Sequence, residues 1–136
     1  MRQFVIQTET QGNCDIVNLM PMLQAELQDL LGQGVVHLFV VGSTAALTTV
    51  EYEPGLVKHD LKAAFDRLVP EDTHYEHEAT WHDDNGHSHV RAAMIGPDLT
   101  VPFQNDKLLT GTWQQIVLVD FDTRPRKREV ICTVLA

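Results

Sequence analysis

The chain has few of the features that mark secreted, membrane-spanning or nucleic-acid-binding proteins. Its 136 residues include only two cysteines, Cys14 and Cys132, too few for a disulfide framework and not spaced as in a zinc finger. No apolar run reaches the length of about 18 residues that a transmembrane helix needs. Acidic residues outnumber lysine and arginine by 19 to 10, and the net charge of −9 argues against a nucleic-acid partner.

What remains is the composition of a globular protein. Apolar residues make up 43% and charged residues 21%, and the length suits one domain spanning residues 1–136. The first nine residues lack the apolar stretch of a signal peptide, so we expect a cytoplasmic protein that does not associate with membranes. The only basic cluster is residues 124–128, either a solvated turn or the cation patch that an acidic protein needs for phosphate.

The order of apolar and polar residues predicts an α+β domain with a mostly antiparallel sheet of about seven or eight strands and two helices. The helices are expected over about 19–31 and 56–68, where apolar residues recur at helical spacing. A long polar loop over about 71–86 follows, and such loops more often have a function than a structural role. Strands are expected at about 3–9, 35–41, 47–52, 87–95, 99–103, 112–121 and 127–135.

Residues 81–89 are the part of the chain richest in potential metal ligands. If residues 87–95 form a strand, His87 and His89 share one of its faces. A third imidazole or a carboxylate from the loop upstream, where His77 lies, would complete the three protein ligands of an open metal site. The same pattern is typical of a polar surface loop whose histidines are solvated or make structural hydrogen bonds.

Small residues follow the buried strand 35–41. In Gly42–Ala46, the amides and the hydroxyls of Ser43 and Thr44 are suited to receive an anion, although such a run also serves close packing between elements. Farther along, Trp113 is typical of a packing or subunit-contact residue. Gln114, beside it on the opposite face, is the better candidate for a ligand contact.

Together, several segments resemble the YjbQ-like family, also described as secondary thiamine-phosphate synthases. The resemblance spans about residues 13–135 and keeps the order and spacing of its motifs. The most specific piece is the Gly-Thr-Trp-Gln-x-Ile motif, followed by an acidic-aromatic pair. The matching segments are Ser43–Thr48, Glu51, Asp60, Tyr75–His77, Ser88–Ala92, Gly96–Pro97, Val101–Pro102, Gly111–Ile116 and Phe121–Asp122.

The resemblance implies a small α+β subunit that forms a homotrimer, with sites near the subunit boundaries. It also implies a metal held by histidines and a weak ability to join a pyrimidine diphosphate to a thiazole phosphate, giving thiamine phosphate and pyrophosphate. Imidazole ligands favour zinc or a similar ion, whereas magnesium would arrive with the phosphorylated substrate.

Residue roles follow as hypotheses. His77, His87 and His89 would hold the divalent metal. Ser43, Thr44 and Arg91 would bind the phosphorylated small molecule. Catalytic roles would fall to Glu51, Asp60 and Gln114, with one of the two carboxylates orienting a ring nitrogen or a water.

One departure from the family pattern leaves alternatives open. Many members have a histidine just before the Ser/Thr-Thr-Ala-Ala segment, where this chain has Gly42. If that histidine is a ligand or an acid/base in the relatives, this protein has lost it. His82 or His87 could compensate for that loss. The alternative is that the chain is a non-catalytic trimeric protein that binds a metal or a phosphorylated metabolite. A third interpretation is metal-assisted phosphoester hydrolysis, which uses the same residues with water as nucleophile.

Overall fold

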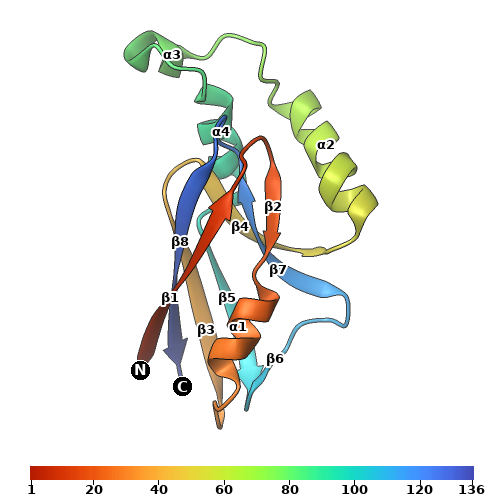
Figure 1. The fold of residues 1–136 in the computed structure, drawn as a ribbon, viewed down its shortest axis with the longest axis vertical. Coiled ribbons are helices and arrows are strands. Elements are labelled where there is room, and N and C mark those ends of the chain that lie inside the picture. The colour runs from red at the N-terminus through yellow and green to blue at the C-terminus, as the bar shows by residue number, and fades with distance from the viewer.

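Two antiparallel sheets pack against each other in the computed structural model, which describes residues 1–136 (Figure 1). The larger sheet has the strand order β1-β8-β3-β5-β6 and the smaller one β2-β7-β4. The two chain termini lie side by side because β1 and β8 are neighbouring strands (Figure 1). The strands are β1 (Arg2–Thr10), β2 (Asp15–Asn18), β3 (Gln33–Val41), β4 (Ala45–Glu51), β5 (Asp98–Gln104), β6 (Lys107–Leu108), β7 (Gln114–Asp120) and β8 (Arg126–Leu135).

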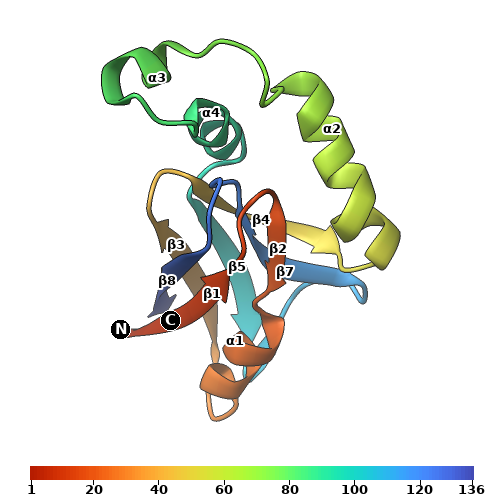
Figure 2. The ribbon, with the colours of Figure 1, turned by 45° about the horizontal axis from the view of Figure 1, so that its top comes forward.

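The helices lie around this pair of sheets. A π-helical turn η1 (Leu56–Asp60) leads into α2 (Leu61–Leu68). Helices α3 (Glu76–Trp81) and α4 (Gly86–Ile95) gather at one end of the sheets, whereas α1 (Met20–Leu27) lies toward the opposite end (Figures 1 and 2). None of the helices is both long enough and apolar enough to cross a membrane.

The smaller sheet is buried on both faces, which makes the core three layers deep. Ile116 and Leu118 of β7 face the larger sheet and α1. Val117 and Val119, which alternate with them, pack on the other face against residues of α2 and α4. This double burial explains why the β7 sequence is almost continuously apolar, since both faces of the strand exclude water.

The predicted fold class is confirmed: the chain is a single α+β domain with eight strands in two antiparallel sheets. The number of helices is larger than the two predicted, because the polar loop contains α3 and the segment after it forms α4. The short strands β2 and β6 were also not predicted.

The strand predicted for residues 87–95 is wrong, because this segment forms α4. Its buried side chains include Ser88, Arg91 and Ala92, which recur at the i, i+3, i+4 spacing of a helix face. Val90 and Met94 are exposed on the other side. The helix ends at Gly96, whose φ of 103° suits a residue without a Cβ, and whose N–H donates to the Ala92 carbonyl.

Both cysteines are free and buried, and we expect them to be inert in the folded protein. Burial raises the pKa of Cys14 from 9.0 to about 11 and that of Cys132 to about 12. Because only the thiolate is nucleophilic, about one Cys14 thiol in a thousand is reactive at pH 8, against about one in ten for an unperturbed thiol. A thiol-specific dye should therefore label neither residue until denaturant is added, and fast labelling of the native protein would contradict this.

Candidate metal centre

His77 presents a buried ring nitrogen to two carboxylates. Its Nδ1 lies 3.1 Å from Asp83 Oδ1 and 3.5 Å from Glu78 Oε1. Neither contact has hydrogen-bonding geometry, so this buried nitrogen has no hydrogen-bond partner. The three donor atoms lie within 4.8 Å of one another. One imidazole and two carboxylates at this separation form a candidate site for a divalent cation.

The turn between α3 and α4 creates this arrangement. His82 ends α3 in the left-handed conformation, with φ of 55°, and its N–H donates to the Glu78 carbonyl. The reversal brings Asp83 back toward His77 on α3. Glu78 is held in place as well, because its Oε1 accepts the N–H of Gly86 at 2.6 Å, at the start of α4.

His89 of α4 stacks against this cluster. The rings of His77 and His89 have centroids 4.4 Å apart and are tilted by 40°. Burial and the neighbouring His77 lower the pKa of His89, and Asp122, Asp83 and Glu78 partly oppose this shift. The folded protein therefore favours the neutral imidazole of His89, which is the form that binds a metal.

His87 is not part of this cluster. Two residues along a helix correspond to a rotation of about 200°, so His87 and His89 leave α4 on nearly opposite sides. The His87 side chain is buried, and its ring lies 6.3 Å from the Tyr75 ring, measured between centroids. Burial, followed by the charge of Arg91, lowers the pKa of His87. The shared face that a strand would have given these two histidines does not exist.

A buried ion pair joins β8 of the larger sheet to β7 of the smaller one. Arg128 donates from Nε and Nη2 to the two oxygens of Asp120, at 2.7 and 2.9 Å. Its Nη2 also donates to Thr44 Oγ1 at 2.7 Å, and Thr10 Oγ1 donates to Asp120. Asp120 is fully buried and Arg128 is 7% exposed, so each charge depends on the other for its stabilisation.

Asp122 connects the ion pair to the histidines. Its Oδ2 accepts hydrogen bonds from Thr44 Oγ1 at 3.0 Å and from Arg126 Nε at 2.9 Å. Burial acts to raise the pKa of Asp122, but the Thr123 N–H, Thr44 and Arg126 outweigh it, and the pKa lies below its ordinary value. A negative charge is therefore kept close enough to His89 to affect its titration.

The two small residues before β4 differ in what they offer to a ligand. Thr44 is buried, and its hydroxyl is already engaged by Arg128 and Asp122, whereas Ser43 is exposed. A Cβ added to Gly42 would lie 2.6 Å from Nη1 of Arg128, and Gly42 has φ of 126°. A histidine at position 42 would therefore have to displace the Arg128 guanidinium. The position of Arg128 in this chain thus goes together with Gly42 in place of the histidine that many family members have.

Arg91 has a structural environment. Its Nε and Nη2 donate to the Val69 carbonyl at 3.0 and 2.8 Å, and Nη2 also donates to Asp66 Oδ1 at 3.1 Å. The side chain is 3% exposed. These bonds tie α4 to the end of α2, and the structure does not bring Arg91 to the histidine cluster.

The three residues assigned catalytic roles lie elsewhere on the chain. Glu51 ends β4 and pairs with Gln114 at the start of β7. Because β4 has seven residues, Glu51 is about 20 Å from the Ser43–Thr44 end of the strand. Gln114 donates from Nε2 to Thr49 Oγ1 at 3.0 Å. Asp60 is exposed at the end of η1, beside His59.

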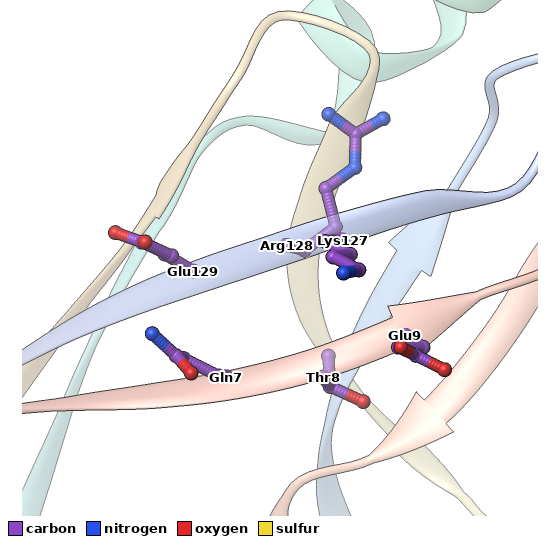
Figure 3. Close-up of a pocket in the computed structure, with 6 residues that line it drawn as sticks. All are labelled: Gln7, Thr8, Glu9, Lys127, Arg128 and Glu129. Carbon is purple, nitrogen blue, oxygen red and sulfur yellow. The ribbon is translucent and has the colours of Figure 1, made fainter.

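A separate polar hollow lies over β1 and β8, with a volume of about 380 Å³ (Figure 3). Figure 3 shows the Arg128 side chain extending away from the other labelled side chains. The hollow includes none of the histidines or of the proposed catalytic residues. Its lining residues are Gln7, Thr8, Glu9, Lys127, Arg128 and Glu129.

The sequence predicts a loop carboxylate only as an alternative third ligand and names neither Asp83 nor Glu78, and the buried ion pair was not predicted. Asp83 lies in the ligand-rich segment 81–89, but nothing in the spacing of Asp83 or Glu78 distinguishes them from the other acidic residues of the polar loop. Asp120 did carry a signal, because it interrupts the apolar run from Ile116 to Phe121. A carboxylate in a strand buried on both faces requires a basic partner, and the basic cluster that follows contains Arg128.

These features define a small α+β protein of two packed sheets with a histidine–carboxylate cluster under its helical end. The family model described as UPF0047 protein YjbQ-like matches residues 4–136. The chain therefore belongs to the UPF0047 family of YjbQ-like proteins.

Relatives in bacteria and archaea have similar sequences and folds. The UPF0047 protein YjbQ of Escherichia coli O157:H7 is 35% identical over 74% of this chain and 72% of its own. A UPF0047 protein of Archaeoglobus fulgidus is 36% identical over 75% and 78%. The crystal structure of a hypothetical protein of Aeropyrum pernix K1 has a TM-score of 0.90 at 25% identity, covering 100% of this chain and 99% of that one.

Proposed function

We propose that the chain is a metal-dependent enzyme of phosphorylated small molecules, with the cation held by His77, Asp83 and Glu78 and with His89 beside it. The observation that carries the proposal is the buried Nδ1 of His77, which lies among carboxylate oxygens without a hydrogen-bond partner. Buried polar atoms in folded proteins nearly always have a partner, and a cation between these donors would satisfy all of them at once.

The donor set fits a divalent ion. Imidazole and carboxylate ligands suit zinc or a similar ion, and magnesium remains suited to an oxygen-rich position completed by a substrate phosphate. When bound, the ion would stabilise negative charge on a phosphate or diphosphate oxygen. The neutral imidazole of His89 is placed to hold or accept a proton beside it, and the exposed Ser43 hydroxyl offers a hydrogen bond to a phosphate.

The resemblance to secondary thiamine-phosphate synthases gives the substrate class. In that reaction the thiazole nitrogen forms a C–N bond to the pyrimidine methylene as the C–O bond to the diphosphate breaks, which releases pyrophosphate. Charge accumulates on the departing oxygen, and a cation there gives the largest electrostatic assistance available to the protein.

The experiment supplies the protein with both substrates after the metal has been removed and then restored. We expect thiamine phosphate to form only with the restored metal, and to fall to background in His77→Ala. The matched control is His59→Ala, because His59 is 80% exposed on η1 and outside the cluster. Equal amounts of thiamine phosphate from His77→Ala and the unmodified protein would contradict the proposal. Release of phosphate from simple phosphoesters would instead favour metal-assisted phosphoester hydrolysis.

The alternative of a non-catalytic binding protein also has support. Glu51 and Gln114 lie about 20 Å along β4 from the Ser43–Thr44 end, so one subunit does not combine all the proposed groups. In that case metal binding survives Glu51→Gln, and turnover stays near background. A turnover number of about 1 per second or more, which is typical of enzymes, would exclude it.

We further propose that the chain forms the homotrimer that the resemblance implies, through the outer face of the larger sheet. Val5, Ile131 and Phe39 form one row across β1, β8 and β3 on that face. Val5 is 47% and Phe39 42% exposed, and Val41 and Leu135 add exposed apolar area nearby. Adjoining exposed apolar side chains of this kind mark protein interaction sites.

The oligomeric state should depend on this face. We expect light scattering after gel filtration to give three times the 15.3 kDa mass of the chain, and Phe39→Lys to shift the protein to the monomer, because a lysine cannot be desolvated there without a partner. Leu31→Lys is the control, since Leu31 is 81% exposed outside this face. A trimer that persists in Phe39→Lys would place the interface elsewhere.

A further inference from the structure

A second hollow lies at the opposite end of β4 from the metal centre. Its volume is about 490 Å³, and it is formed where the end of β4 meets the start of β7. Glu51 and Glu53 are its only charged residues, and no basic residue lines it. The complete lining is Asn18, Glu51, Tyr52, Glu53, Pro54, Thr112, Trp113 and Gln115.

Two aromatic side chains open onto this hollow. The register that pairs Glu51 with Gln114 places Tyr52 and Trp113 opposite each other one residue beyond the ladder. Trp113 is 74% exposed and Tyr52 is 44% exposed, so both rings offer surface to a ligand. The Tyr52 ring is fixed, because its hydroxyl donates to the Ile16 carbonyl at 3.1 Å.

The two carboxylates differ in availability. Glu53 is engaged by the start of η1, since its oxygens accept the N–H groups of Gly55 at 2.7 Å and Leu56 at 2.9 Å. The Glu51 carboxylate is exposed and makes no side-chain hydrogen bond or ion pair within the chain. Glu51 is therefore the group free to pair with a ligand.

We propose that this hollow binds an organic cation, such as a substituted ammonium group, with Glu51 as its counter-ion and Trp113 and Tyr52 as aromatic walls. A positive charge is attracted to the faces of tryptophan and tyrosine, and apolar groups around that charge pack against the same rings. The net charge of −9 adds a long-range attraction for cations. A phosphorylated anion would meet two carboxylates and no basic residue here, so the site is chemically distinct from the proposed metal centre.

The test follows tryptophan emission in the full-length protein carrying Trp81→Phe, because Trp81 and Trp113 are its only tryptophans. The probe is choline, and the matched control is 3,3-dimethylbutan-1-ol, which has the same shape without the charge. We expect choline to change the emission saturably and to bind about tenfold or more tightly than the neutral alcohol. Equal binding of the two compounds, or no saturable change with choline, would overturn the proposal.

Variants assign the effect to the site. Glu51→Gln should weaken choline binding about tenfold, whereas Asp60→Asn removes the same charge outside the hollow and should leave it unchanged. His77→Ala should also leave it unchanged, which separates this proposal from the proposed function. Equal losses in Glu51→Gln and Asp60→Asn would show general charge attraction and overturn the site. If the emission changes with the protein concentration and not with the choline concentration, Trp113 lies in a contact between copies of the chain. That result would also overturn the proposed site.

Discussion

Replacing Asp120 by alanine is expected to lower the free energy of unfolding by about 3–5 kcal/mol, because the buried Arg128 guanidinium loses both of its hydrogen-bonded carboxylate oxygens and keeps only Asp122 Oδ2, 3.8 Å away. Arg128 is 7% exposed and donates two hydrogen bonds to Asp120, so water cannot replace the lost carboxylate without opening the end of the core. The measurement is equilibrium unfolding in urea, analysed at constant slope.

A double variant makes this prediction specific. Asp120→Ala combined with Arg128→Met removes both charges of the pair, and Asp122 keeps its ion pair with Arg126, so we expect a smaller loss of stability than in Asp120→Ala alone. The exposed pair Arg2–Glu26 is the comparison, and Glu26→Ala should cost about 1 kcal/mol or less. If Asp120→Ala costs no more than Glu26→Ala, the buried ion pair contributes no more to stability than an exposed one.

The second large effect concerns the metal. Replacing His77 by alanine is expected to weaken binding of zinc about a hundredfold or more, because it removes the only nitrogen among the three clustered donors. In the unmodified protein, zinc at a hundred times its dissociation constant should raise the free energy of unfolding by about 2.7 kcal/mol. His77→Ala should lose that increment.

Calorimetric titration and thermal unfolding measure the two quantities independently. His59→Ala is the matched control, since His59 also lies beside a carboxylate but is 80% exposed. Unchanged zinc affinity in His77→Ala would contradict the assignment, whatever the effect on stability. Asp83→Asn tests the oxygen donor in the same way and should fall between the two histidine variants.

The sequence predicts most of the fold because its signals are local. The alternation in β1 and the continuous apolar run in β7 follow directly from burial on one or both faces of a strand. The helical stripe over 56–68 likewise follows from one face packing on the smaller sheet. These patterns can be recognised without knowing which helix or strand packs against each face.

The prediction for α4 was wrong for a physical reason. The pattern His-x-His fits a strand, but the segment also places Ser88, Arg91 and Ala92 at helical spacing. Over ten residues the strand period and the helix period both fit the sequence. Because Arg91 was interpreted as a ligand-binding residue, the buried helix face to which it belongs was not recognised. Packing of that face against the smaller sheet decides for the helix.

The candidate site depends on tertiary contacts that cannot be predicted from the spacing of residues along the sequence. His77 and His89 are twelve positions apart in the chain, and their rings meet only because the turn at His82 reverses the chain between two helices. Asp83 and Glu78 join them through the same reversal. The sequence could predict which residue types would bind a metal, but not which of the histidines converge.

Whether His77, Asp83 and Glu78 hold a divalent ion beside His89 can be tested by anomalous diffraction from a crystal of the zinc-loaded protein, collected on both sides of the zinc absorption edge. We expect a zinc peak about 2.0–2.2 Å from His77 Nδ1, with carboxylate oxygens of Asp83 and Glu78 completing the coordination. A zinc peak bound elsewhere on the chain, with the His77 ring outside its coordination sphere, would contradict it.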